Sequence, residues 1–289
     1  MKDEVSKLSP AKINLYLEII NRRNDGFHNI ESLMTFCNYG DIITVKRSNK
    51  FIFKIKGPFS SSLKMRENLI EKTIRELEKI YQRKFLVSID LKKNLPISSG
   101  MGGGSSNAAT VIKCIKEIFQ LDEPEYFKRF LLSLGADVPF CYYGQTALVS
   151  GIGENLDFVE NMREFYILLI NPKIEISTKE IFSGLKVNSK NKNTFPVTNL
   201  MLSSIGDIMR RNNDLENYIV KINNEILEIL NNLKSYKGCL LSRMTGSGAT
   251  CFGLFDSIND LDCALVKARR KFKNYWIKST KLINSIKHI

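Results

Sequence analysis

The chain has 289 residues, 43% of them hydrophobic and 25% charged, which suffices for a sizeable core in one large or two modest domains. Its formal net charge is +13, but the lysines and arginines are spread along the whole chain and no aromatic-rich nucleic-acid motif lies among them. The polar first ten residues have no apolar signal-peptide segment, and nothing approaches the roughly 18 consecutive apolar residues of a membrane-spanning helix.

Strands and helices are both predicted along the first half of the chain. Alternating apolar residues indicate strands, and apolar residues on one face at helical spacing indicate helices. Pro124 suits the first turn of a helix, and Gly135 suits a helix end. The predicted strands are 11–20, 42–47, 51–56 and 85–95, and the predicted helices are 67–81, 107–121 and 124–134.

The regular spacing of apolar residues is lost around 155–163, and a second unit begins there. We therefore expect one domain over residues 1–158 and another over 159–289. In the second unit, strands and helices mix without the regular βα alternation of a parallel sheet. The polar segment 183–198 is the best candidate for an exposed loop. The predicted strands are 164–172, 239–256 and 275–283, and the predicted helices are 213–233 and 257–271.

The cysteine content points to a reducing compartment. The six cysteines include no CxxC pair and the chain has only two histidines, so neither a disulfide framework nor a structural zinc site is expected. We expect six reduced, mostly buried cysteines in a cytoplasmic protein. The basic residues are expected to form a solvated surface that suits anionic small molecules, with neither nucleic acid nor a membrane as partner.

A glycine- and serine-rich segment, "LPISSGMGGGSSNAAT" over 95–110, precedes a predicted helix. Glycine lets backbone N–H groups approach a ligand closely, and a helix beginning there adds free N–H donors and a positive dipole end. This combination favours a phosphate site. The alternative is a turn that only links a strand to a helix. The segment matches neither a P-loop, because no lysine follows the glycines, nor the dinucleotide fingerprint, because Ser105 occupies the third glycine position.

Three polar residues stand in unusual surroundings, and the residues alone leave the role of each open. Lys12 lies among apolar residues of a predicted strand, where a lysine often extends its charged end to the surface. His28 follows a turn and taken alone suits a surface position. Asp137 precedes Val138 and Pro139, so it is either a turn aspartate bonded to its own backbone or a carboxylate held for catalysis; the proline disfavours helix at Val138.

Six motifs follow one another in an order that resembles the GHMP kinase superfamily. The resemblance spans about residues 8–256 and implies an α+β fold of two domains, with the active site in the cleft between them. The N-terminal domain is expected to be of the ribosomal S5 domain 2-like type, and the C-terminal α+β domain to be smaller. The motifs are "PAKINL" (10–15), "DGFH" (25–28), the glycine-rich segment (96–110), "GADVP" (135–139), "GIGE" (151–154) and "TGSGA" (245–249).

The combination of "PAKINL", "DGFH" and "GADVP" resembles one branch of that superfamily. Kinases of this branch use ATP and Mg²⁺ to phosphorylate the 2-hydroxyl of 4-diphosphocytidyl-2-C-methyl-D-erythritol, a step of non-mevalonate isoprenoid synthesis. The resemblance implies Asp137 as the general base and Lys12 as its cationic neighbour, and the sequence shows no dedicated metal ligands. The implied ATP-binding residues are Asn68, Pro96, Ile97, Ser98, Ser99, Gly100, Met101, Gly102, Gly103, Gly104, Ser105 and Ser106.

The cytidine end of the substrate is expected at "DGFH". The resemblance implies that His28 reads the cytosine and that Phe27 stacks on it, although Phe27 lacks the hydroxyl of the commoner tyrosine. Phe182 is expected on the other face of the base, and Asn14 is expected to contact the substrate.

Two motifs depart from the common pattern or leave a choice. Ser98 and Ser99 stand where glycine is frequent, so a positive φ costs more at these positions. The "TGSGA" motif is either a second ligand loop or a tight connection that supports the glycine-rich loop, and we favour the supporting role.

Three other functions are alternatives to the kinase that this resemblance implies. Another GHMP kinase, acting on homoserine, mevalonate or a sugar, would have no base for "DGFH" to read. A non-catalytic nucleotide sensor would be expected to lack Lys12 or Asp137, and both are present. A nucleic-acid-binding protein rests on charge alone. The enzyme is expected to be a monomer or a homodimer.

Overall fold

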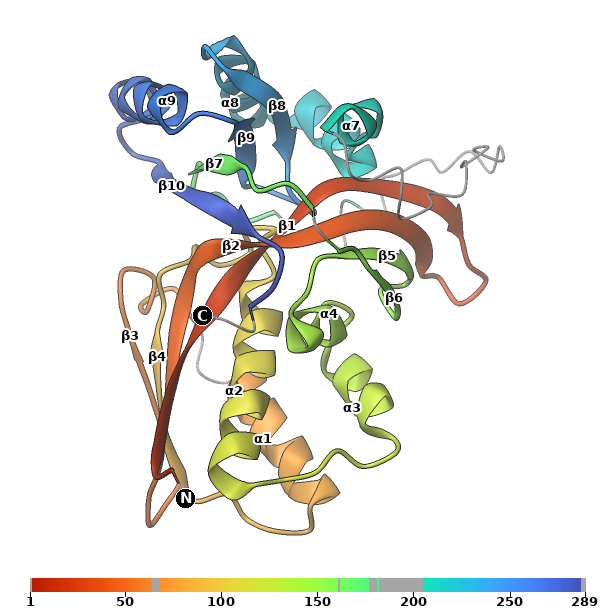
Figure 1. The fold of residues 1–289 in the computed structure, drawn as a ribbon, viewed down its shortest axis with the longest axis vertical. Helices are drawn as coiled ribbons and strands as arrows, with labels where there is room; N and C mark the ends of the chain where they lie inside the picture. Colours follow the sequence, from red (N-terminus) through yellow and green to blue (C-terminus); the bar gives the residue numbers. More distant parts are fainter. Residues whose placement is uncertain (1, 64–67, 161, 177–180, 182–204, 287–289) are drawn as a thin grey trace.

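The computed structural model describes residues 2–63, 68–160, 162–176, 181 and 205–286. In that part of the chain ten strands form one bent sheet, whose main path runs β3-β4-β2-β10-β7-β9-β8. Two long antiparallel strands, β1 (Glu4–Arg22) and β2 (His28–Arg47), pair along nearly their whole length and extend from the N-terminal part into the C-terminal part (Figure 1). They are the framework on which the functional residues are placed.

The N-terminal part packs helices on one face of the sheet formed by β1 to β4 (Figure 1). Its core joins apolar residues of β2 and β4 to those of the four helices. The strands that complete this part are β3 (Ile52–Lys56), β4 (Val87–Lys92), β5 (Ala147–Gly151) and β6 (Asn155–Phe158). The helices are α1 (Leu69–Ile80), α2 (Gly103–Phe119), α3 (Phe127–Leu134) and α4 (Val138–Tyr143).

The C-terminal part continues the same sheet. Its strands join β2 through β10, where Leu282 pairs with Cys37 and Ile283 with Phe36. The core under its helices also contains Leu17 of β1, so the first strand contributes to both parts. The strands are β7 (Tyr166–Asn171), β8 (Cys239–Met244), β9 (Cys251–Phe255) and β10 (Trp276–Ile283). The helices are α6 (Ile205–Arg210), α7 (Asp214–Ile222), α8 (Asn224–Ser235) and α9 (Ile258–Lys271).

Most predicted elements are present, with different ends. The strand expected over 11–20 extends over the whole of β1, and the strand expected over 42–47 is the end of β2. The helix expected from residue 107 begins four residues earlier, at Gly103, inside the glycine-rich segment. The helix ending before Gly135 is confirmed, although α3 begins after Pro124. Strands β5 and β6 and helix α6 were not predicted, because each is short and lacks a long apolar period.

Two predictions about helices are wrong, each for a local reason. The single helix expected over 213–233 is broken at Asn223, whose backbone is extended and whose side chain accepts a hydrogen bond from the N–H of Ile226 as the N-cap of α8. The non-helical Val138 is instead the first residue of α4. Pro139 is tolerated there because the first helical turn needs no N–H donor from it, and Val138 and Phe140 are both fully buried.

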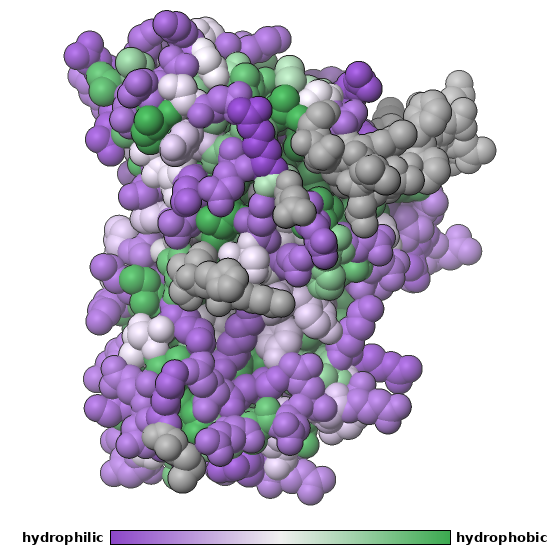
Figure 2. All heavy atoms as spheres, viewed as in Figure 1, coloured by the Kyte–Doolittle hydropathy of each residue, from purple (hydrophilic) through white to green (hydrophobic). Residues whose placement is uncertain are grey.

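The face shown in Figure 2 is largely hydrophilic, and most of the cysteines are buried. Hydrophilic residues cover most of the face in Figure 2, interrupted by small hydrophobic areas. Four of the six free cysteines are buried, as expected. Among the described residues, no helix combines the length and the apolar character that crossing a membrane requires. Segment 183–198, expected to be a loop, lies outside the described residues.

Candidate active site

A large cavity of about 1150 Å³ brings together the sequence motifs from both parts of the chain. Its walls come from the β1–β2 hairpin, the glycine-rich segment with the start of α2, the start of α4, and the connection between β8 and β9. Among the lining residues are Lys12, Asn14, Phe27, His28, Asn68, Lys93, Asn107, Asp137, Gly246 and Ser247. Motifs more than 200 residues apart in the sequence thus share one site.

Lys12 and Asp137 form an ion pair in this cavity. The Nζ atom of Lys12 lies 2.9 Å from Oδ2 of Asp137 and donates a 2.9 Å hydrogen bond to Oδ1 of Asn14. The Lys12 side chain is 5% exposed, whereas that of Asp137 is 29% exposed. The lysine therefore does not extend to the surface, and the carboxylate of Asp137 keeps one side open to a ligand.

The path of β1 explains why Lys12 and Asn14 face the cavity. Successive strand residues point to opposite faces, so Ala11, Ile13 and Leu15 enter the core while the two polar residues between them face outward from it. Register shifts against β2 occur between Pro10 and Lys12 and again after Asn14. Such bulges redirect side chains, and here they bracket the two cavity residues.

Asn14 is fixed by the groups around it. Its Nδ2 donates to Oγ of Ser32 over 2.8 Å, and its backbone N–H donates to Oγ1 of Thr245 over 2.9 Å. The hydroxyl of Ser32 in turn donates to the carbonyl of Tyr16. These contacts turn the amide oxygen of Asn14 toward Lys12, so the two side chains and Asp137 form one polar group.

The glycine-rich segment forms the wall opposite the hairpin. Gly102 has φ +61°, and a Cβ added there would lie 2.9 Å from Cε of Lys12, so only glycine lets the loop approach the lysine this closely. Ser98 has φ +46°, so the positive φ expected there is present, whereas the same expectation is wrong for Ser99, which has no positive φ. Helix α2 begins at Gly103 without a side-chain cap, so its first N–H groups remain available to an anion.

Most of the predicted loop residues line the cavity, and two do not. Met101 is fully buried, and its carbonyl accepts a hydrogen bond from the N–H of Lys12. Ser106 is buried, and its Oγ lies 3.0 Å from the Oγ of Ser9, away from the cavity. The lining residues of the loop are Pro96, Ile97, Ser98, Ser99, Gly100, Gly102, Gly103, Gly104 and Ser105.

The "TGSGA" motif supports the glycine-rich segment from the C-terminal part. A Cβ on Gly100 would collide with the carbonyl of Thr245, and the N–H of Thr250 donates to the carbonyl of Ser99. Asn213 holds the motif from its other side by donating to the carbonyls of Met244 and Gly246. The supporting role favoured from the sequence is thus observed, while Gly246 also lines the cavity.

Phe27 and His28 lie at the base of the β1–β2 hairpin turn. The N–H of Arg23 donates to the carbonyl of Phe27, and Asp25 accepts from the N–H of the same phenylalanine. The ring of Phe27 is 59% exposed and lines the cavity beside His28. Burial, and then the positive charge of Arg22, lower the pKa of His28, so its imidazole is neutral at pH 7. Phe182, expected opposite Phe27, lies outside the described residues.

Asn68 combines a structural contact with an available donor. Its Oδ1 accepts from the N–H of Ile70 as the N-cap of α1. Its Nδ2 is buried and has no hydrogen-bond partner among the residues that the structure describes, and Asn68 lines the cavity. A buried amide without an acceptor costs free energy, so a ligand acceptor in the cavity would satisfy it.

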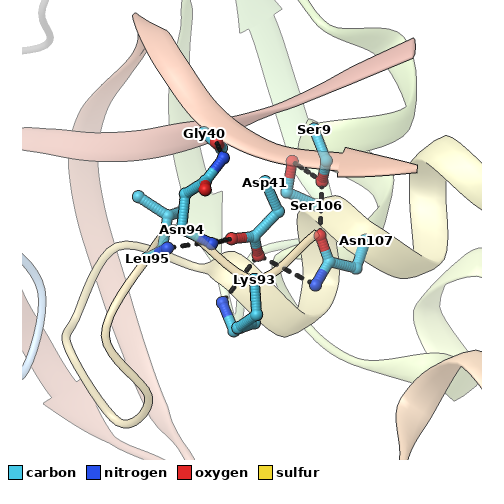
Figure 3. A network of polar contacts seen from close by, with 8 residues as sticks. All are labelled: Ser9, Gly40, Asp41, Lys93, Asn94, Leu95, Ser106 and Asn107. Carbon is cyan, nitrogen blue, oxygen red and sulfur yellow. Dashed lines mark hydrogen bonds and ion pairs between the residues drawn. The ribbon is translucent and has the colours of Figure 1, made fainter. Parts of the chain in front are cut away.

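A buried polar network beside the glycine-rich segment was not found from the sequence. Asp41 of β2 and Lys93, just after β4, form a 2.6 Å ion pair with side chains 0% and 4% exposed (Figure 3). Lys93 and Asn107 also line the cavity. The signal in the sequence is strand alternation, because Val87, Ile89 and Leu91 occupy one face and Lys93 is the next position on it.

Comparison with known proteins agrees with this arrangement. The model of the GHMP kinases N terminal domain matches residues 68–145, and that of the GHMP kinases C terminal domain matches residues 200–274. Neither match reaches the boundary expected after residue 158, which stays a prediction. A 4-diphosphocytidyl-2-C-methyl-D-erythritol kinase of Chelativorans sp. (strain BNC1) is 38% identical over 279 residues, covering 94% of each chain.

Solved structures with similar folds are also kinases. The chain superposes on a crystal structure of 4-(cytidine 5'-diphospho)-2C-methyl-D-erythritol kinase with a TM-score of 0.79 and 26% identity, over 96% of this chain and 99% of that one. A homoserine kinase from Cytophaga hutchinsonii has a TM-score of 0.72 at 16% identity, over 99% and 96% of the two chains, and shows the shared fold alone. The chain is a small-molecule kinase of the GHMP superfamily and belongs to its 4-diphosphocytidyl-2-C-methyl-D-erythritol kinase family.

Proposed function

We propose that the protein transfers the γ-phosphoryl group of ATP to the 2-hydroxyl of 4-diphosphocytidyl-2-C-methyl-D-erythritol. The observation that carries this proposal is the pairing of Lys12 with Asp137 inside a cavity that also contains the open start of α2 and the Phe27–His28 pair. One cavity thus offers a base, an anion site and an aromatic ring beside a neutral imidazole. These are the groups that a kinase with a nucleotide-linked alcohol as substrate requires.

Asp137 acts as the general base in this mechanism. Its carboxylate is the more exposed member of the pair and faces the cavity, so it can accept the proton of the attacking hydroxyl. The ammonium group of Lys12, 2.9 Å away, favours the charged form of that carboxylate and offsets the negative charge that develops during transfer. Asn14 holds Lys12 in place and contacts the substrate from the same strand.

The nucleotide binds along the glycine-rich segment and α2. The free N–H groups of the first turn of α2 suit the phosphates, and the buried Nδ2 of Asn68 suits an acceptor on the adenine.

The described residues bring no three His, Cys, Asp or Glu side chains together at one point. Asp137, which lines the cavity beside Gly102 of the glycine-rich segment, would be a carboxylate available to a magnesium ion bound with the nucleotide, and the ion would neutralise phosphate charge.

The cytidine group binds at the hairpin. The exposed ring of Phe27 offers a stacking face, and the imidazole of His28 offers a ring nitrogen for a hydrogen bond to the base edge. Phe182 is proposed for the other face on resemblance alone. We also place the enzyme in the cytoplasm, in keeping with its free cysteines, as a monomer or homodimer.

ADP release from a panel of substrates tests this function. Wild-type protein with ATP and Mg²⁺ is expected to turn over the cytidine-linked methylerythritol and to leave mevalonate, homoserine and galactose unchanged. Asp137→Asn is expected to lose turnover while binding ADP, and Asp262→Asn, on the exposed face of α9, is the matched control. Turnover of another panel member would contradict the cytidine assignment, and ADP binding without any turnover would favour a nucleotide sensor.

A further inference from the structure

One carboxylate connects both ends of the glycine-rich segment to the central strand (Figure 3). Asp41 accepts four hydrogen bonds: from Nζ of Lys93 over 2.6 Å, from the backbone N–H groups of Asn94 over 2.7 Å and Leu95 over 2.9 Å, and from Nδ2 of Asn107 over 3.0 Å. The loop of the glycine-rich segment, residues 96–102, follows Leu95 and precedes α2, and Asn107 lies in the second turn of that helix. The residues that flank the loop on both sides are therefore hydrogen-bonded to Asp41.

The two carboxylate oxygens of Asp41 accept hydrogen bonds from different donors. Oδ1 accepts from the two backbone N–H groups, and Oδ2 accepts from Lys93 and Asn107. The far side of the Asn107 amide is held as well, because its Oδ1 lies 2.7 Å from the Oγ of Ser9 on β1 (Figure 3). Lys93, Asn94 and Leu95 are consecutive residues just after β4, and Asn107 lies in α2, so a change at Asp41 of β2 weakens the contacts of β2 with both segments at once.

Two lysine–aspartate pairs adjoin consecutive glycines at the start of α2. A Cβ on Gly102 would lie 2.9 Å from Cε of Lys12, and one on Gly103 would lie 3.3 Å from Nζ of Lys93. The partner of Lys12 is partly exposed and can meet a substrate. The side chain of Asp41 is 0% exposed and cannot, whereas its partner Lys93 lines the cavity. Any effect of Asp41 on a ligand must therefore pass through Lys93 and the loop.

We propose that Asp41 is a positioning residue that holds the Lys93 ammonium and both ends of the glycine-rich loop in the geometry that binds the phosphates of the nucleotide. This inference rests on the proposed function for the identity of the ligand. It predicts that losing the Asp41 charge weakens nucleotide binding and leaves binding of the phosphoryl acceptor at the hairpin unchanged.

Asp41→Asn tests the proposal with little change of shape. The amide oxygen can still accept from Asn94 and Leu95, but the new NH₂ group faces the donors of Lys93 and Asn107. We expect the Kd for ADP, measured by calorimetry, and the KM for ATP to rise about 10- to 100-fold, as for loss of a charge-assisted hydrogen bond. The KM for the cytidine substrate is expected to stay within about twofold, because the hairpin keeps its contacts.

The control is Asp90→Asn, the same change on the neighbouring strand β4, where Asp90 alternates with the buried Ile89 and Leu91 and faces away from the cavity. It is expected to bind ADP as the wild type does. A folded Asp41→Asn protein with a lower Tm and an unchanged Kd for ADP would show a structural role only and would overturn the proposal.

Lys93→Met keeps the proposal testable if Asp41→Asn does not fold, since Asp41 then retains three of its four donors. We expect it to weaken ADP binding to the same extent, and unchanged binding would overturn the proposal. Because Asp41 holds both Lys93 and the loop, the double variant is expected to bind ADP more weakly than Lys93→Met but by less than the product of the two single losses, whereas fully additive free-energy losses would contradict the part of the effect assigned to Lys93. ADP binding requires no phosphoryl acceptor, so these results stand even if the wild type fails to phosphorylate the cytidine substrate.

Discussion

Lys12 has two oxygen partners in the cavity, and together they explain how a lysine is accommodated on a buried strand. Asp137 balances its charge, and Asn14 accepts a second hydrogen bond over 2.9 Å. A buried charge is tolerated only when it is paired and hydrogen-bonded in this way. The position therefore requires both a positive charge and the length of a lysine.

Lys12→Met keeps an unbranched side chain that is one atom shorter and removes its charge. We expect kcat to fall about 10²- to 10⁴-fold, because the base and the transferred phosphoryl group both lose their cationic neighbour. ADP binding is expected to persist, because the loop backbone is unchanged. Single-turnover phosphorylation measures the effect, and Lys7→Met, on the same strand and paired with Glu117 at the surface, is the control. An unchanged kcat would rule out the role proposed for Lys12.

The pH dependence of substrate binding reports on His28. Because its pKa is lowered by burial and by Arg22, the imidazolium form appears only below the ordinary histidine range. We expect the KM for the cytidine substrate to stay constant from about pH 8 to about pH 6.5 and to rise at lower pH as the neutral form is lost. A His28→Gln variant is expected to have a higher KM without this acid rise. A KM that falls on acidification would mean that the charged imidazole binds the base.

At the scale of elements, the sequence indicated most helices and strands and missed features that depend on the local backbone conformation or on the pairing of two strands. Periodicity located α1, α9 and β7 to within a few residues. It could not show that Asn223 caps a new helix, because an asparagine within an apolar period looks like an exposed helical residue until its backbone is seen. The bulges around Lys12 are also invisible, because register is a property of the strand pair.

Two glycines of the same loop are expected to respond in opposite ways to alanine. At Gly100, with φ +74°, the added Cβ would collide with the carbonyl of Thr245, so Gly100→Ala is expected to lower the free energy of unfolding by more than about 1 kcal/mol. At Gly104, in the first turn of α2, a Cβ meets nothing within 4 Å, so Gly104→Ala is expected to be neutral or to stabilise by about 0.5–1 kcal/mol. Urea unfolding measures both changes. Equal values would show that contact with Thr245 has no energetic weight.

At the scale of the whole molecule, the motifs indicated which residues share the site, and the fold supplied the contacts. The resemblance placed Lys12 and Asp137 in one active site, and the structure brings them to 2.9 Å. The Asp41–Lys93 pair could not be predicted, because neither residue lies in a motif and their pairing depends on β2 lying beside β4. Ser106 shows the reverse, since a residue inside the motif faces Ser9 and not the cavity.

The sequence boundary after residue 158 is not expected to separate two independent folding units. Leu17 and Ile19 of β1 belong to the core beneath α7–α9, and β10 pairs with β2. We expect the fragment 159–289 alone to lack a cooperative thermal transition, and mixing it with fragment 1–158 to restore one. Near-ultraviolet circular dichroism measures both. A cooperative transition in the isolated fragment would contradict this view of the core.

The shared strand also sets the order in which the protein can be completed during synthesis. Leu17 and Ile19 leave the ribosome before Ala268 and Phe272 of the same core are made, roughly 10 s or more earlier at ordinary rates. Until then the outer half of the β1–β2 hairpin presents its apolar side to water. During that interval the nascent chain carries an incomplete hydrophobic surface, and that surface is where a ribosome-associated chaperone would bind.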